Sequence, residues 1–334
     1  MENAISKAAF QSFLDILPPV EFACVYGSSL HPNNHDKTSM TDFILSVSDP
    51  TQWHSENLRL NKNHYASSWM VNFGGASLVT GVADNIGVGV HFNPFVNWSG
   101  KMYKYGVVRT RDLLQDVLHW EKFYLCGRLQ KPVHIVVDNL DINSTNSVNL
   151  RAAMSAALLL LPSEFTEADL YAKVCSLSYM GDLRMLFAED KNKVKKIVAG
   201  QFGLFHSIYK PFLEEYEAKK LLRLSSTVNH QIKVYQDCDV SVACSLVSAL
   251  PASIRSQMSV KQGDKMKLSE TGQIVHGIAI RSREEAANCL QRILRRKVMA
   301  SSARQAISGL LAAGGMNATR YLAQKVSKAW KSWR

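Results

Sequence analysis

Apolar runs and helix-like spacings alternate along the first half of the chain. Apolar or alternating runs predict strands at residues 21–26, 41–47, 88–92, 102–108 and 132–137. Apolar residues three and four positions apart predict helices at residues 5–17, 51–60 and 111–124. From residue 147 onward the spacing is largely helical. The pattern therefore predicts an α+β protein whose second half is rich in helix.

A polar stretch at residues 141–146 is the best candidate for a domain boundary. With 334 residues and 46% hydrophobic content, the chain can bury a core in each of two domains. We predict a first domain at residues 1–145, a helical domain at 146–300 and a separate tail at 301–334. No apolar run reaches the roughly 18 residues of a transmembrane helix, so we expect no membrane-spanning segment.

The net charge of +11 is concentrated at the C-terminal end. From Arg281 onward there are twelve Lys and Arg residues against two acids, whereas the first 280 residues hold 27 bases and 26 acids. An anionic partner would therefore meet the C-terminal part of the chain. The first 17 residues show no targeting peptide. The six cysteines form no CxxC pair, which favours buried thiols in a reducing compartment over disulfides or zinc.

The tail has the pattern of a cationic amphipathic helix. On a helical wheel, Leu322, Val326, Trp330 and Trp333 share one face, and lysines populate the rest. Such a helix suits an anionic bilayer surface, whereas a helix packed on the protein core is the alternative. The residues that we predict to bind the membrane are Lys325, Lys328, Trp330, Lys331 and Trp333.

The most informative motif joins a Gly-Ser turn to a strand-borne carboxylate. The first predicted strand ends at Tyr26 and runs into Gly27, Ser28 and Ser29, and the second strand carries Asp42. Glycine allows a tight turn whose N–H groups can face an anion, and an aspartate beside it can hold Mg²⁺ against phosphates. Most Gly-Ser pairs are ordinary turns, so the prediction of nucleotidyl transfer depends on the combination.

A polar stripe follows the second strand. His54, Asn57, Asn61 and His64 recur at steps of three, four and three, so one helix would place them on a single face. They could line a site for a nucleotide or a lipid phosphate, or they could form a solvated helix face. On spacing alone, the solvated helix face is the favoured interpretation.

Several charged residues occur where a triphosphate could use them. Lys104 lies within an otherwise apolar strand, and Arg128 and Lys131 lie in a helix-to-strand turn. Asp182 and Arg184 follow Gly181 between predicted helices, where a local capping pair is the alternative. Each group could also be ordinary surface.

Taken in order, these segments resemble one protein family. The segments are Tyr26-Gly27-Ser28, Thr41-Asp42-Phe43-Ile44, Trp53-His54 with Asn57, Asn61, His64 and Tyr65, Phe92-Asn93-Pro94, Lys104-Tyr105-Gly106, Gly127-Arg128-Leu129-Gln130-Lys131-Pro132, and Gly181-Asp182-Leu183-Arg184-Met185 with Glu189 and Lys193. The family is that of the mitochondrial CDP-diacylglycerol synthases, also called mitochondrial translocator assembly and maintenance proteins.

The resemblance implies a fold, a reaction and a location. It implies a DNA polymerase beta-like nucleotidyltransferase domain, then a helical winged-helix-like domain and a C-terminal amphipathic helix. It implies transfer of CMP from CTP to phosphatidate, giving CDP-diacylglycerol and pyrophosphate for cardiolipin and phosphatidylglycerol synthesis. The enzyme would be peripheral on the matrix side of the mitochondrial inner membrane, with Mg²⁺ as cofactor and no nucleic-acid partner; its oligomeric state is left open.

The resemblance also assigns roles to residues. The catalytic residues would be Asp42, which would hold Mg²⁺, and Asp182. The nucleotide would be bound by Tyr26, Gly27, Ser28, Ser29, His54, Asn57, Asn61, Lys104, Arg128, Lys131 and Lys193. In the wider superfamily a second acid lies two residues after the first, where this chain has Ile44. A second metal carboxylate would therefore have to come from Asp49, Asp182 or Glu189.

Two other functions remain possible on the sequence. A nucleotidyltransferase acting on RNA or a small metabolite would need a basic groove with stacking aromatics, but the first 200 residues are almost charge-neutral. A non-enzymatic membrane scaffold aiding protein translocation would keep the basic tail but would not need Gly27, Ser28 and Asp42 together.

Overall fold

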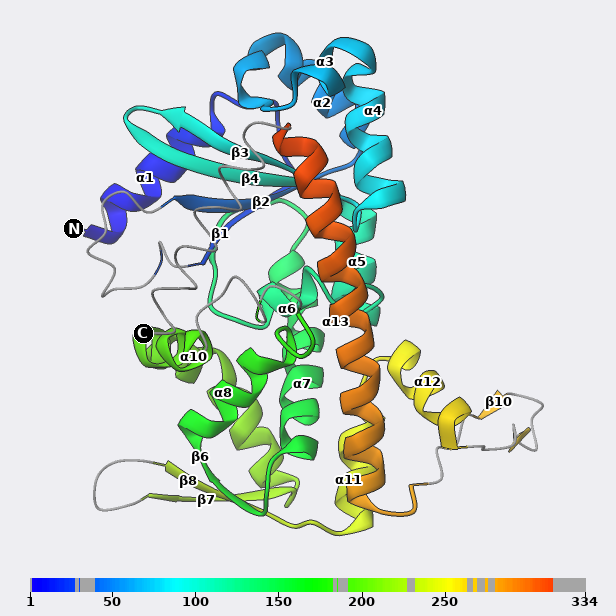
Figure 1. Ribbon diagram of the computed structural model, residues 1–334. Coiled ribbons are helices and arrows are strands. Elements are labelled where there is room, and N and C mark those ends of the chain that lie inside the picture. Colours follow the sequence, from blue (N-terminus) through cyan, green and yellow to red (C-terminus); the bar gives the residue numbers. More distant parts are fainter. Residues whose placement is uncertain are drawn as a thin grey trace.

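The computed structural model describes residues 2–27, 30, 40–182, 185, 192–226, 232–262, 267–268, 274–275 and 280–314. A β-sheet with its covering helices forms the upper half of the molecule in Figure 1, and a helix-rich part forms the lower half. The mixed α+β fold predicted from the apolar pattern is confirmed.

The main sheet has the strand order β3-β4-β2-β1-β5. Its strands are β1 Phe22–Tyr26, β2 Thr41–Val47, β3 Val90–Trp98, β4 Lys101–Arg109 and β5 His134–Asp138. The neighbours β2 and β4 run parallel, and the other pairs are antiparallel. All the predicted strands are present, and the first two begin and end within one residue of the prediction.

The two faces of this sheet pack against different helices. Because side chains alternate along a strand, Phe43 and Leu45 join one core cluster with α1 (Glu2–Leu14), and Ile44 joins another with α5 (Thr110–His119). The helix α2 (Pro50–Leu60) belongs to the α1 side through Trp53. Asp49 caps α2 by accepting from the backbone N–H groups of Thr51 at 2.8 Å and Gln52 at 3.2 Å.

Short helices follow α2 at the top of the molecule in Figure 1. They are η2 Lys62–His64, α3 Ser68–Phe73, α4 Gly75–Gly81 and the π-helical turn η3 Val82–Ile86. Tyr65, Met70, Val79 and Val82 form a small core of their own beneath them.

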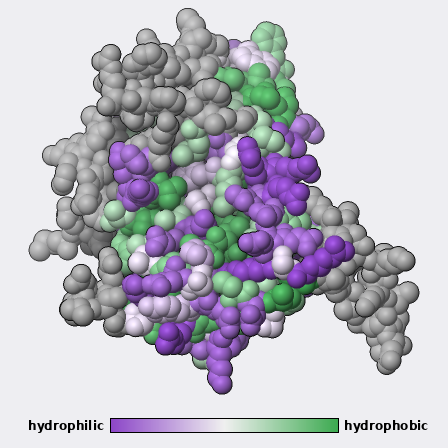
Figure 2. Space-filling view, turned by 60° about the horizontal axis from the view of Figure 1, so that its bottom comes forward, coloured by the Kyte–Doolittle hydropathy of each residue, from purple (hydrophilic) through white to green (hydrophobic). Residues whose placement is uncertain are grey.

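The lower part contains helices and a second sheet, of strand order β6-β8-β7. Its elements are α7 Ile142–Leu160, β6 Glu164–Thr166, α8 Glu167–Leu177, α10 Lys193–Ala218, β7 Leu222–Ser226, β8 Ile232–Gln236, α11 Val240–Ser248, α12 Ala252–Gln262, the short pair β9 Lys267–Leu268 and β10 Ile274–Val275, and α13 Arg283–Ala313. Figure 2 shows the lower face, where hydrophobic side chains are interspersed among hydrophilic ones.

The last helix, α13, joins the two parts. It packs on α7, α11 and α12 below and on β3 and η3 above, so it runs along much of the molecule in Figure 1. It also crosses residue 300, where the sequence suggested the tail to begin. No helix among the described residues is long and apolar enough to cross a bilayer.

The structure corrects one local prediction, the end of a helix, and adds two features that the sequence did not predict. The polar stretch 141–146 forms the first turn of α7, because Asp138 accepts from the backbone N–H groups of Ile142 and Asn143. The helix predicted to continue to residue 124 ends at His119, where Trp120 adopts a left-handed conformation. The sheet of β6, β7 and β8 was not predicted. Four of the six cysteines are buried, as expected, whereas Cys238 and Cys244 are exposed.

Candidate active site

Three neighbouring strands place three predicted site residues side by side. Tyr26 on β1 is paired in register with Asp42 on β2, and Asp42 is paired with Lys104 on β4. Lys104 Nζ lies 3.4 Å from Asp42 Oδ1, and each side chain is about a quarter exposed. Lys104 Nζ also lies 4.6 Å from the ring centre of Phe92. An accessible ion pair therefore lies on the face of the sheet that carries α5.

The Gly27 turn comes directly against Asp42. Gly27 has a φ of +92°, a conformation that favours glycine, and a Cβ built on it would lie 3.4 Å from Asp42 Oδ2. The chain therefore turns beside the carboxylate without a side chain between them. The next described residue, Leu30, donates its N–H to the carbonyl oxygen of Gly27 at 3.2 Å.

Arg128 reaches the same region from α6 (Cys126–Leu129). Its guanidinium lies 3.9 Å from the ring centre of Tyr124 and 5.3 Å from that of Tyr26, and it donates to the carbonyl oxygen of Tyr124 at 2.7 Å. Burial raises the pKa of Tyr26, while the charges of Lys104 and Arg128 lower it. The phenol therefore stays neutral beside two cations.

A second group of cations adjoins Arg128. Lys131 Nζ donates to Ser178 Oγ at 2.7 Å and to the carbonyl oxygen of Gly127, and it lies 5.3 Å from the ring centre of Tyr179. Lys193 Nζ lies 5.3 Å from the same ring. Burial, together with the charges of Arg128 and Lys193, lowers the pKa of Lys131 to about 8. Its ammonium group therefore loses its proton more easily than that of an exposed lysine.

Asp182 lies close to this second group in the chain. It is 2% exposed, and its backbone N–H donates to the carbonyl oxygen of Tyr179 at 3.2 Å in a turn after α8. Gly181 before it has a φ of +79° and packs against Arg295 of α13. Asp182 is thus joined through its backbone to Tyr179, the residue whose ring two lysines contact.

The structure limits which residues could supply a second metal carboxylate beside Asp42. Asp49 and Asp42 lie near opposite ends of β2, roughly 20 Å apart, so Asp49 cannot share a metal ion with Asp42. Glu189 lies outside the described residues. Within the described part of the chain no group of three or more His, Cys, Asp or Glu side chains could hold a metal ion.

The polar stripe lies on the other face of the sheet. His54 and Asn57 are 0% exposed, so the interpretation as a solvated helix face is wrong. Asn57 Nδ2 donates to the hydroxyl oxygens of Tyr105 at 2.8 Å and Tyr65 at 3.1 Å, and His54 Nδ1 lies 2.7 Å from Tyr65 Oη. Because Tyr105 is next to Lys104 on β4, it points away from the Asp42 face.

Asn61 and His64 complete the buried hydrogen-bond network that His54 and Asn57 form with two tyrosines. Asn61 caps the end of α2 and donates to Asn57 Oδ1 at 2.9 Å, and His64 Nδ1 lies 3.0 Å from Tyr105 Oη. Burial lowers the pKa of His54 and His64, so both rings are neutral at neutral pH. The structure therefore does not bring His54, Asn57 and Asn61 together with Asp42.

Sequence reasoning missed one residue that shapes the site. Asp116 on α5 is 4% exposed, and its carboxylate accepts from five successive backbone N–H groups of residues 122–126 at 2.7 to 3.1 Å. These bonds fold the segment that carries Tyr124 and leads into α6. The available signal was an acid on the apolar face of a predicted helix, three residues after Leu113.

Some predicted site residues lie outside the described residues. They are Ser28 and Ser29 of the turn, and Lys325, Lys328, Trp330, Lys331 and Trp333 of the tail. Among the described ones, the structure groups Tyr26, Gly27, Asp42, Lys104, Arg128, Lys131 and Lys193.

Comparison with known proteins gives the same family as the motif order. Residues 10–328 match the family described as phosphatidate cytidylyltransferase, mitochondrial. The chain belongs to this family. Relatives named phosphatidate cytidylyltransferase, mitochondrial, include the mouse protein, 31% identical over 94% of this chain and 92% of its own length. The cattle protein is 33% identical over 98% of this chain and 96% of its own length. The Schizosaccharomyces pombe protein is 31% identical over 93% of this chain and 80% of its own length. The resemblance to this family is thereby confirmed along nearly the whole chain.

Proposed function

We propose that the cluster of Gly27, Asp42, Lys104 and Arg128 is where this protein makes CDP-diacylglycerol. The protein is a phosphatidate cytidylyltransferase by family membership, so its substrates are CTP and phosphatidate. The observation that carries the assignment of the site is the Asp42–Lys104 ion pair beside the bare turn at Gly27. A carboxylate, a cation and an open backbone turn are what a nucleoside triphosphate and its metal ion need.

Each residue has a role in this proposal. A phosphate oxygen of phosphatidate attacks the α-phosphorus of CTP, a new P–O bond forms, and the bond to pyrophosphate breaks. The backbone at Gly27 lies against the β- and γ-phosphates, and Lys104 and Arg128 offset the charge that builds up on the leaving pyrophosphate. Lys131 and Lys193 hold the distal phosphates from the second group of cations, and Asp182 orients that group. The catalysis consists mainly of positioning and charge neutralisation.

Asp42 is the proposed ligand of Mg²⁺. Magnesium is usually bound through one or two carboxylates together with substrate phosphates, so a single accessible carboxylate beside a triphosphate fits it. The close approach of Asp42 Oδ2 to the turn at Gly27 supports this, because no side chain separates the carboxylate from the phosphates. When bound, the ion would supply positive charge to the phosphate oxygens. Lys104 would then release Asp42 and turn to the phosphates.

The fold and the membrane association belong to the same proposal. The main sheet, with the site residue Asp42 on β2, fits a DNA polymerase beta-like nucleotidyltransferase domain, and the lower part fits a helical winged-helix-like domain. The family's mitochondrial name places the protein in that organelle. We further propose the matrix side of the inner membrane, a supply of CDP-diacylglycerol for cardiolipin, and a basic tail that binds anionic lipid.

The test is CDP-diacylglycerol formation from labelled CTP and phosphatidate vesicles with Mg²⁺. Asp42→Ala should abolish product while the unfolding midpoint is unchanged. Asp49→Ala is the matched control, because that exposed aspartate only caps α2: it should lose about 1 kcal/mol of stability and keep its activity. Full activity in Asp42→Ala would remove the proposed site, and wild-type protein that bound vesicles without making product would favour the scaffold function.

A further inference from the structure

The helix α3 exposes two large aromatic side chains. Phe73 is 88% exposed and Trp69 is 42% exposed, and they lie four residues apart, on one side of the helix. Six of the twelve exposed large hydrophobic side chains among the described residues belong to this end of the molecule. They are Leu60, Trp69, Phe73, Ile86, Ile307 and Leu310. A concentration of this kind marks an interaction surface more often than chance exposure does.

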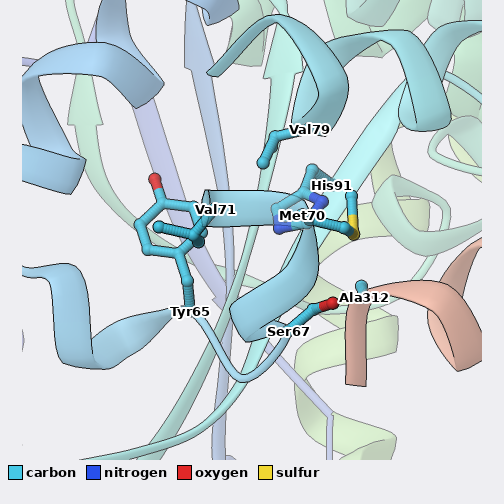
Figure 3. Close-up of a pocket in the computed structure, with 7 residues that line it drawn as sticks. All are labelled: Tyr65, Ser67, Met70, Val71, Val79, His91 and Ala312. Carbon is cyan, nitrogen blue, oxygen red and sulfur yellow. The ribbon is translucent and has the colours of Figure 1, made fainter. Parts of the chain in front are cut away.

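The opposite side of α3 is firmly anchored. Met70 is 1% exposed and lines a small pocket between α3, α4 and the end of α13, together with Val79 and Ala312 (Figure 3). Leu311 of α13 packs on the same cluster. Because this side of α3 is packed against the rest of the protein, the fold itself holds Trp69 and Phe73 at the surface.

The charged residues nearest to α3 in the sequence are basic. Between Asn57 and Ala83 the sequence contains two charged residues of the Lys, Arg, Asp and Glu types, Arg59 and Lys62. Both are exposed, at the end of α2 and the start of η2. The acids that border this stretch are Glu56 and Asp84, and Asp84 pairs with Arg109 at 3.3 Å. Aromatic side chains near two exposed cations match the interface of an anionic bilayer, where tryptophan is favoured and basic residues meet headgroups.

The C-terminal part of the chain starts beside α3. A Cβ built on Gly314, at the end of α13, would lie 3.3 Å from the carbonyl oxygen of Ala66 and 3.6 Å from Cα of Ser67, the residue before α3. Residues 315–334, which follow, hold five Lys and Arg residues and no acids. The attachment point of the basic segment and the aromatic pair thus lie at the same end of the molecule.

We propose that Trp69 and Phe73 insert into an anionic membrane surface, so that α3 is a membrane contact in its own right. This inference rests on the proposed function to the extent that phosphatidate, the lipid substrate, resides in a bilayer. Arg59 and Lys62 meet the headgroups while the two aromatic rings enter the interface. The basic C-terminal segment starts at the same place, so the two contacts strengthen each other's binding to one surface.

The test is flotation with phosphatidylcholine vesicles that contain phosphatidate. The double variant Trp69→Gln/Phe73→Gln should bind at least about tenfold more weakly than wild type, because it loses two aromatic side chains from the interface. The effect should be present both in the full chain and after removal of residues 316–334. The matched control is Val148→Gln/Val240→Gln, which removes two other exposed apolar side chains and should bind like wild type.

Turnover separates membrane contact from damage to the site. On a short-chain, water-soluble phosphatidate the Trp69→Gln/Phe73→Gln variant should match wild type, while on vesicles it should be slower. Unchanged flotation of this variant in both backgrounds would overturn the proposal. The proposal would also be overturned if wild type were a dimer and the variant a monomer with unchanged vesicle binding, because α3 would then bind a second copy of the chain.

If wild type made no product from either substrate, the proposed function would be contradicted, and the flotation result would still test the membrane contact by itself.

Discussion

Lys131 Nζ donates a hydrogen bond of 2.7 Å to Ser178 Oγ. This bond links the end of α6, which packs beneath the main sheet, to the turn after α8 in the lower part. A Cβ on Gly127 would lie 2.6 Å from Ser178 Cβ, so a glycine at this position permits the approach. The two parts of the molecule therefore meet at a cation of the proposed CTP site.

CTP binding should depend on pH through Lys131. Burial lowers the pKa of Lys131 to about 8, so the free protein is partly deprotonated there, and a bound triphosphate would restore the charge. Near pH 8 CTP binding should therefore take up a proton and weaken as the pH rises. Calorimetry in buffers of different ionisation enthalpy measures this uptake. Lys131→Met should abolish it, and Lys101→Met, at the exposed start of β4, should not.

Gly27→Ala should reduce turnover more than about tenfold. The substitution costs about 1–2 kcal/mol of backbone strain at a positive φ and places a methyl group against Asp42 Oδ2. Gly100→Ala is the matched control, because Gly100 has a φ of +74° and nothing lies within 4 Å of its added Cβ. Both variants should lose similar stability. Equal activity of the two would show that the Gly27 turn does not contact the substrate.

Asp116→Asn should destabilise the protein by about 3 kcal/mol, because the charged acceptor of several backbone N–H groups is lost. Urea unfolding measures the change. Asp112→Asn on the same helix breaks a partly exposed ion pair with Arg109 and should cost less than about 1 kcal/mol. If the two variants were equally stable, the carboxylate of Asp116 would not be what holds residues 122–126.

The free energy of unfolding should fall with acid through the buried histidines. Burial lowers the pKa of His91 from 6.5 to about 4, so between these values the unfolded state binds a proton that the folded state does not. Stability is therefore complete above about pH 6.5 and is lost progressively as the pH falls towards 4. His91 alone contributes about 3 kcal/mol to this loss. His91→Gln should make the free energy of unfolding depend less on pH between about 4 and 6.5. An unchanged dependence on pH would show that His91 is not the source of this loss of stability.

Local sequence pattern was enough to single out the central residues of the proposed site. Gly27 and Asp42 sit at the ends of two buried strands, and a continuous apolar run in the sequence marks each of them. Lys104 could be singled out because an unpartnered cation is unfavourable in an apolar strand, and its partner proved to be Asp42.

The remaining features depend on partners distant in the sequence. The polar stripe is buried because Tyr105, which is 48 residues from Asn57, supplies a hydroxyl to it, and spacing along one helix cannot reveal this. The early end of α5 likewise follows from the return of residues 122–126 to Asp116. The aromatic rings around Arg128 come from β1 and from the segment after α5.

The packing of α13 has a consequence for how the chain folds while it is being synthesised. Leu311 and Ala312 complete the small core around Met70, and Ser308 lies against Gly87. On the ribosome these residues emerge more than two hundred positions after the short helices that they cover. The small core around Met70 therefore stays open until nearly all of the protein has left the exit tunnel. A nascent chain stalled before residue 300 should be markedly more sensitive to protease around α3 than the finished protein.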